Sequence, residues 1–204
     1  MIKLLQYRAA LVTVMFGLFG GAISNFLVIE EYSWIYFGLA SILGLTVNLL
    51  VSFLLKSRWS KGIKNNIKMV CIFLFTAMVV NLYMHTKFFL ERTFAYRDFN
   101  NEVTYYVKGT EYTSLAKAFK LANPQIESDA DLIMEGFGSP LEKGKVWTEA
   151  SIIESWLKLI SSYALFIIFF VALISILIEV LMGQYGKTTA KSMEIISGKS
   201  TDEG

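Results

Sequence analysis

Four long apolar stretches constrain the fold of this chain more than any other feature. They cover residues 9–29, 34–55, 69–89 and 157–181. A helix needs about 20 apolar residues to cross the hydrocarbon core of a bilayer, so each stretch is long enough, or nearly so, to span it. A polar block at 90–156 is large enough to fold. We therefore predict an all-α integral membrane protein with four transmembrane helices and a small, mainly helical module outside the membrane.

The composition agrees with a membrane protein and excludes several kinds of site. Hydrophobic residues make up 54% of the chain and the mean hydropathy is +0.50, both above the usual soluble range. The single cysteine, Cys71, excludes an intrachain disulfide and a metal site built from several thiolates. The single histidine, His85, argues against a histidine-based metal or catalytic cluster. Both prolines, Pro124 and Pro140, lie in the polar block, so the apolar stretches contain no proline kink.

The first apolar stretch also has features of a secretory signal peptide. Lys3 and Arg8 precede the apolar run, as basic residues do in such signals. The run is longer than a typical signal core, and no clear small-residue cleavage site precedes Glu30 and Glu31. We therefore interpret this stretch as an uncleaved first membrane helix.

The basic residues are unevenly distributed between the connections, and this predicts the orientation. Lysine and arginine accumulate in short cytoplasmic loops. The connection at 56–68 is rich in them and contains no acidic residue. We predict that this loop and both termini are cytoplasmic, in a bacterial inner membrane, and that the polar block faces outward. The domains are then 1–89 (three helices and the basic loop), 90–156 (extracytoplasmic module), 157–182 (fourth helix) and 183–204 (cytoplasmic tail).

Small and polar residues recur at helical spacing in the first two stretches. Residues three or four apart share a helix face, and small residues there let a second helix approach closely. We interpret these positions as packing surfaces, within one chain or between the chains of a homo-oligomer. They are Gly17, Gly21, Ser41, Gly44, Asn48 and Ser52.

A polar path across the membrane is a second interpretation. Asn25, Asn48, Asn81 and His85 could line such a path, because polar groups inside a membrane are costly and often functional. However, the middle of each stretch lacks Asp, Glu, Lys and Arg, and Glu179 lies at the inner end of the fourth. A proton relay or an ion-coupled transporter normally needs such a charge, so packing is the favoured interpretation.

Alternating residues at 103–108 predict a short strand in the polar block that ends at Gly109. The preceding segment, 91–101, we interpret as a continued helix or a polar exit from the third span. Aromatic side chains are frequent in the block, and we predict that they form a small core. They are Tyr105, Tyr106, Tyr112, Phe119 and Trp147.

Signals for two short helices follow the strand. Thr113 or Ser114 can cap a helix that ends before Pro124, because the residue before a proline disfavours helical geometry. Ser128 can begin a second helix at 129–135.

A much longer helix is predicted at the end of the block. Thr148 can cap it, and Trp147 can pack on Ile152 as a hydrophobic staple. No helix breaker appears between Glu149 and Gly183. We therefore predict one helix, about 50 Å long at 1.5 Å per residue, that joins the module rigidly to the fourth span. A mobile tail is expected after Gly183.

The block contains no catalytic constellation, since it lacks His and Cys. Its acids Glu127, Asp129, Asp131 and Glu135 lie on one segment that we expect to be solvated. They could bind calcium weakly, but they lack the ordered spacing of a calcium loop. No glycine-rich phosphate motif occurs. We therefore predict that the protein is not an enzyme and uses no metal or cofactor.

The connection after the second stretch forms a basic cluster of Lys56, Arg58, Lys61 and Lys64 around Trp59. One role for it is contact with anionic membrane lipid, worth about 1 kcal/mol per basic residue. The other is docking of an acidic cytosolic protein. Direct binding of nucleic acid is not expected, because the membrane topology already accounts for the charge.

The layout has four spans, a basic inner loop after Leu55, an outer module before the last span and no catalytic set. In this it resembles the small membrane subunits of bacterial anti-phage defence systems, such as the KwaA family of the Kiwa system. The resemblance implies a membrane sensor that assembles with a cytosolic effector. We expect a non-enzymatic, homo-oligomeric sensor or scaffold. The alternatives are a pore-forming or membrane-disrupting effector and an immunity protein against a pore-forming toxin, and an integral membrane enzyme is least favoured.

Overall fold

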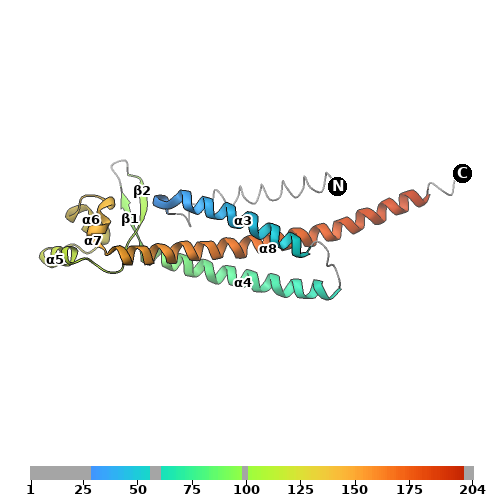
Figure 1. Cartoon of the computed structure of the whole chain (residues 1–204), viewed down its shortest axis with the longest axis horizontal. Helices are drawn as coiled ribbons and strands as arrows, with labels where there is room; N and C mark the ends of the chain where they lie inside the picture. Colours follow the sequence, from blue (N-terminus) through green and yellow to red (C-terminus); the bar gives the residue numbers. More distant parts are fainter. Residues whose placement is uncertain (1–28, 56–60, 98–100, 200–204) are drawn as a thin grey trace.

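The computed structural model describes residues 29–55, 61–97 and 101–199, with side chains described for 29, 31–55, 66–97 and 101–181. Three long helices form a bundle, and the elements between the second and third of them form a module at one end (Figure 1). The elements are η2 (Glu30–Tyr32), α3 (Ser33–Leu55), α4 (Lys61–Arg92), β1 (Thr93–Arg97), β2 (Val103–Val107), α5 (Ser114–Ala122), α6 (Asp129–Gly136), η3 (Pro140–Glu142), α7 (Lys143–Val146) and α8 (Glu149–Lys199).

Three of the described helices are long and apolar enough to cross a membrane. The candidate spans are Ser33–Leu55, Asn66–Arg92 and Glu149–Leu181. They contain the second, third and fourth apolar stretches, and the described chain is mostly helical, so the prediction of a helical chain with several helices of membrane-spanning length is confirmed. The first stretch, 9–29, lies outside the described residues except for Ile29, and a fourth span stays a prediction.

Helix α8 is the central helix of the bundle. It packs against α3 and against α4, whereas these two helices make few contacts with each other (Figure 1). Helices α3 and α8 both run away from the module, so they are parallel to each other and antiparallel to α4. This arrangement leaves much of the surface of α3 and α4 uncovered, and α8 is the only element of the described chain that holds both.

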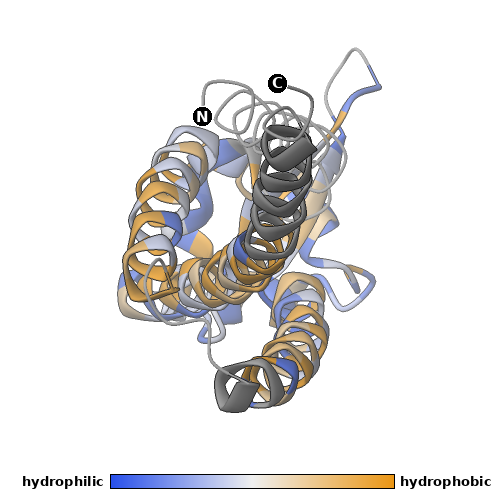
Figure 2. Cartoon of the chain, turned by 90° about the vertical axis from the view of Figure 1, so that its right-hand side faces the viewer, coloured by the Kyte–Doolittle hydropathy of each residue, from blue (hydrophilic) through white to orange (hydrophobic). Residues whose placement is uncertain are grey.

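The uncovered surface of the bundle is apolar. Seen along the bundle, α3 and α4 are coloured mainly as hydrophobic (Figure 2). Phe53 on α3 is 82% exposed and Phe73 on α4 is 68% exposed. Contiguous apolar surface of this extent is unfavourable in water and is suited to contact with lipid.

The module has its own hydrophobic core. Its buried residues come from β1, α5, α6, α7 and the segments beside them: Phe94, Ala116, Ile126, Leu132, Ile133, Val146 and Trp147. Of the predicted aromatic core, Trp147 is buried and three others pack against it, namely Tyr106, Tyr112 and Phe119. Tyr105 instead contacts Phe89 of α4, with 5.0 Å between the ring centroids. The prediction of a small aromatic core is therefore correct except for Tyr105.

A β-hairpin joins the module to the bundle. Strand β2 covers the predicted residues except Lys108, and it pairs with β1 in antiparallel register, with Thr93 opposite Val107 and Arg97 opposite Val103. The interpretation of residues 91–101 as a helix or a polar exit was wrong from Thr93 to Arg97, which form β1. The pairing partner lies further along the chain, so the local sequence of β1 carries little signal for it.

The two short helices begin at the predicted caps. The Thr113 hydroxyl accepts a hydrogen bond from the N–H of Ala116, and the Ser128 hydroxyl accepts one from the N–H of Asp131. Each satisfies a backbone donor that the first turn of a helix leaves unpaired. Thr148 differs, because its buried hydroxyl has no hydrogen-bond partner, and only its carbonyl accepts bonds from α8.

Helix α8 has 51 residues and is longer than predicted. The predicted end near Gly183 was wrong, since the helix continues to Lys199. One glycine costs a helix about 1 kcal/mol relative to alanine, which disfavours the helix without ending it. The tail expected to be mobile is thus helical over most of its length.

Candidate functional site

Polar contacts inside the apolar bundle link α4 to α8. Asn81 Nδ2 donates to the carbonyl oxygen of Ser162 at 2.7 Å, and His85 Nδ1 lies 2.7 Å from Ser162 Oγ. The Ser162 hydroxyl donates its one proton to the carbonyl of Leu159, so we assign the His85 contact as Nδ1–H donating to Ser162 Oγ. His85 and Ser162 are both buried. A single α8 serine therefore fixes two α4 side chains.

A second set of contacts links α3 to α8. The rings of Tyr36 and Tyr163 meet edge to face with centroids 4.7 Å apart, and Ser175 Oγ donates to Asn48 Oδ1 at 3.1 Å. Both contacts join residues 127 positions apart, so the parallel helices keep one register over three turns. Gly44 lies between the two contacts and is buried. Close approach at small residues is typical of helix packing in membranes.

These contacts favour packing over a polar path for the described candidates. Asn48, Asn81 and His85 each contact a serine of α8 in the same chain, and Gly44 is buried on α3. Ser41 is exposed and donates to the carbonyl of its own helix at Phe37. The other predicted packing and path residues are Ser52, which is half-buried on α3, and Gly17, Gly21 and Asn25, which lie outside the described residues.

A charged contact joins the connection before α3 to the module. Lys143 Nζ lies 2.5 Å and 2.7 Å from the two carboxylate oxygens of Glu31, and both side chains are largely buried. The N–H of Val107 in β2 also approaches Glu31, at 3.4 Å from Oε2. The sequence analysis missed this pair because its members are 112 positions apart. The only sequence signal was a carboxylate in a very short connection.

Tyr32 lies beside this pair and completes the contact. Its ring is 5.6 Å from Lys143 Nζ and 5.8 Å from the centroid of Trp156 on α8. Burial, and then the neighbouring Glu31 carboxylate, raises the pKa of Tyr32 to about 12. The connection before α3 thus contacts three elements, namely β2, α7 and α8.

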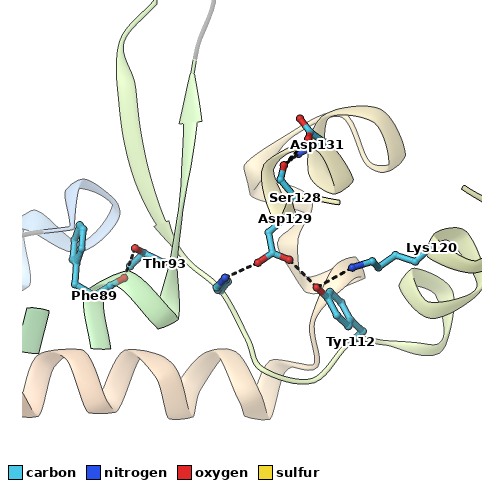
Figure 3. A network of polar contacts seen from close by, with 8 residues as sticks. Phe89, Thr93, Tyr112, Lys120, Ser128, Asp129 and Asp131 are labelled. Atoms are coloured by element: carbon cyan, nitrogen blue, oxygen red, sulfur yellow. Dashed lines mark hydrogen bonds and ion pairs between the residues drawn. The ribbon is translucent and has the colours of Figure 1, made fainter. Parts of the chain in front are cut away.

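A polar network holds the helices of the module, as Figure 3 shows. Asp129 at the start of α6 accepts hydrogen bonds from Lys108 Nζ at 2.5 Å and from Tyr112 Oη at 2.7 Å. Lys120 of α5 lies 4.8 Å from the centroid of the Tyr112 ring. Burial and the bond to Asp129 raise the pKa of Tyr112 to about 12. The expectation that Asp129 is merely solvated was wrong, since it joins the start of α6 to the connection between β2 and α5.

The remaining predicted residues belong to the basic cluster. Lys61 and Lys64 fall in the first turn of α4, whereas Lys56 and Arg58 lie outside the described residues. In the parts of the chain that the structure describes, no group of three or more His, Cys, Asp or Glu could hold a metal ion.

Comparisons of the chain with protein families, with curated proteins and with solved structures found no match. The residues described above are therefore the basis for a function.

Proposed function

We propose that the protein is a non-enzymatic membrane subunit that receives a signal through its outer module and transmits it to a cytosolic partner. The observation that carries this proposal is the continuity of α8. Its first turns contact the module core through Ile152, its middle packs against α3 and α4, and its last turns extend beyond both (Figure 1). At 1.5 Å per residue, 51 residues make about 75 Å. No flexible joint interrupts this length.

Two rigid connections leave the module, which supports a role in transmission. One is α8 itself. The other is the Glu31–Lys143 pair, which fixes the connection before α3 to the module. A rearrangement of the module would therefore move α3 and α8 relative to each other. Their contacts include the Tyr36–Tyr163 ring pair and the Asn48–Ser175 hydrogen bond, so such a movement would act on these two contacts.

The arrangement of the helix ends supports the proposed orientation. The module and η2 lie at one end of the bundle, and the end of α3 and the start of α4 lie at the other. The first turns of α4, with the basic residues Lys61, Lys64 and Lys68, belong to this second end. Since basic residues concentrate on the cytoplasmic side, we propose that the module faces outward. A first span at 9–29 would place the N-terminus, like the C-terminus, in the cytoplasm.

The proposed partner is an acidic cytosolic protein that binds the basic cluster, with anionic lipid as a further contact. Anti-phage defence is the setting that the layout suggests. A homo-oligomer is also proposed. Because Asn48 bonds Ser175 within one chain and Gly44 is buried, we propose Gly17, Gly21 and the exposed Ser41 for contact between chains.

Affinity purification of the full chain in mild detergent tests the proposal. The variant carries Arg58→Glu, Lys61→Glu and Lys64→Glu, and we expect a soluble protein that copurifies with the wild type to be lost. Charge reversal at the exposed module residues Lys117 and Lys145 is the control, and it should retain the partner.

Two results would count against the proposal. One is retention of every copurifying protein by the triple variant. The other is loss of the partner in the module control alone, which would place the binding surface on the module and not on the basic cluster. Expression level and detergent extraction of each variant should match the wild type, so that misfolding is not mistaken for lost binding.

A further inference from the structure

The β1–β2 hairpin has two faces with different surroundings. Directly opposed residues of an antiparallel pair share a face, and alternate residues point to opposite faces. Phe94, Tyr96 and Tyr106 lie on one face and pack in the module core. The other face begins at Val107, which is buried in the bundle core. Its outer part, here called the bundle-side face, consists of Ala95, Arg97, Val103 and Tyr105.

The bundle-side face is exposed and largely apolar. Tyr105 is 41% exposed and Val103 is 46% exposed. Arg97 is exposed and is the one charged residue in the two strands. The module does not cover this face, because the module helices pack on the opposite side of the hairpin.

The hairpin also has an unusual direction. Its strands run across the long axis of the bundle and project to one side (Figures 1 and 2). If the bundle axis follows the membrane normal, the hairpin extends along the membrane surface. Its bundle-side face then looks toward the bilayer, as the contact of Tyr105 with Phe89 of α4 indicates.

Exposed apolar side chains of the spans lie at the same end of the bundle as this face. Leu90 on α4 is 72% exposed and Trp34 on α3 is 74% exposed, both at the module end of the bundle. Tyrosine and tryptophan are enriched at the membrane–water interface, where the ring is apolar and one edge is polar. Arginine pairs with phosphate through two parallel hydrogen bonds. The composition of the bundle-side face therefore matches the headgroup region of a bilayer.

We propose that the bundle-side face of the hairpin is a membrane-docking surface for the outer phospholipid interface. Tyr105 and Val103 contact the boundary between headgroups and acyl chains, and Arg97 binds a lipid phosphate. The hairpin contacts the module core with its other face, so lipid composition or thickness would act directly on the module. This inference rests on the membrane placement in the proposed function.

Lipid quenchers placed at known depth test the docking surface in the reconstituted full chain. A Cys71→Ala background carries one cysteine, Val103→Cys, labelled with an environment-sensitive fluorophore. We expect quenching by phospholipids that carry the quencher near the headgroup, and less by quenchers near the bilayer centre. Thr104→Cys, the next residue, points to the opposite face and should be quenched far less.

Arg97→Gln tests the phosphate contact in nanodiscs with and without anionic phospholipid. A basic residue near an anionic surface contributes enough to change binding about fivefold. The measured quantity is the ratio of docking, reported by the label at Val103, in anionic relative to zwitterionic nanodiscs. We expect Arg97→Gln to lower this ratio about fivefold. Lys117→Gln, at an exposed position of α5, should leave it unchanged.

Three results would overturn the docking surface. Equal quenching at Val103 and Thr104 would remove the distinction between the faces. A Val103 label that reports water in every bilayer would show that the face is not docked. Protection that depends on protein concentration and persists without lipid would assign the face to a second copy of the chain.

A label at Leu45→Cys, which is 61% exposed on α3, separates this inference from the proposed function. If the label at position 45 is quenched and the label at Val103 is not, only the docking surface is contradicted. If the label at position 45 is not quenched, the membrane placement itself is contradicted.

Discussion

The module and the bundle are held together in different ways. In the module, Leu132, Ile133 and Val146 are completely buried around Trp147, as in a water-soluble domain. In the bundle, α4 is covered only along one narrow side, and its contacts with α8 include the hydrogen bonds of Asn81 and His85. The chain thus combines a region stabilised by excluding water with one whose exposed surface is suited to lipid.

This difference has a physical origin. Burial of apolar surface from water stabilises a domain by about 25 cal/mol per Å². Lipid tails are as apolar as leucine, so helices in a bilayer gain little from burying leucine against each other. Close packing and a few interhelical hydrogen bonds remain. Substitutions in the two regions should therefore differ in size and in kind.

Trp147→Ala should have the largest effect. The side chain is 1% exposed and its ring contacts Phe94 and Tyr112. Removal of a buried aromatic ring costs about 3–5 kcal/mol, through lost burial and the cavity left behind. We expect the module to unfold while the spans stay helical, measured by limited proteolysis of the full chain in detergent.

The matched control is Trp34→Ala, because Trp34 is 74% exposed on α3. It should leave the protease resistance of the module unchanged. Equal sensitivity of both variants would show that the module has no independent core.

Disruption of the Glu31–Lys143 pair should have the next largest effect, because it acts at the junction of the two regions. Both side chains are largely buried, at 20% and 13% exposure. Glu31→Gln should cost about 2 kcal/mol, since it weakens hydrogen bonds between charged groups. Thermal unfolding in detergent measures the loss.

Lys145→Met is the control, since the Lys145–Glu142 pair is exposed and should contribute at most about 1 kcal/mol. The exchanged pair Glu31→Lys with Lys143→Glu should recover part of the lost stability. If the double variant is no better than the sum of the single ones, the two charges do not interact.

Alkaline pH should destabilise the module through Tyr112. Its pKa is raised to about 12 in the folded chain, against an ordinary value of 10. The stabilisation is therefore complete below pH 10 and is lost as the pH rises toward 12. The ring is partly solvent-exposed, so we expect a loss of about 1 kcal/mol or less.

The measurement is the melting temperature of the module between pH 9 and pH 11.5. Tyr112→Phe should be less stable than the wild type at neutral pH and should show a shallower decline at high pH. An unchanged slope would assign the alkaline response to other groups, such as Tyr32, whose pKa is also raised to about 12.

Asn48→Leu and Asn81→Leu should have the smallest effects. An interhelical hydrogen bond in a membrane contributes about 0.6 kcal/mol on average. Each variant should lower the unfolding free energy in bicelles by about that amount. Thr76→Val is the control, because Thr76 is exposed and bonds only its own helix.

The same two variants separate packing from a pore. If the asparagines only hold helices together, overexpression of the wild type should cause no ion or dye leakage. Leakage that disappears in Asn48→Leu and Asn81→Leu would instead support the pore-forming alternative.

Several elements were predictable because their signals are local. The length of the apolar stretches identified α3, α4 and α8. The capping residues Thr113 and Ser128 identified the starts of α5 and α6. The alternation at 103–108 identified β2, which ends one residue earlier, at Val107. Each of these signals lies within a few residues of the structure that it specifies.

Contacts between distant residues were not predictable from one sequence. Strand β1 carries little signal of its own, and it pairs with β2, which lies further along the chain. Asn48 was a candidate for a path or for packing, and only the position of Ser175 shows which bond its side chain makes.

The sequence by itself determined that the chain has apolar helices of membrane length, a foldable block between them and one basic end, because length, hydropathy and charge are additive along the chain. The tertiary structure alone decided that α8 is central, that Glu31 pairs with Lys143, and that the hairpin lies between the two cores. These features depend on which distant surfaces meet, and that choice is made by packing and by the pairing of buried polar groups.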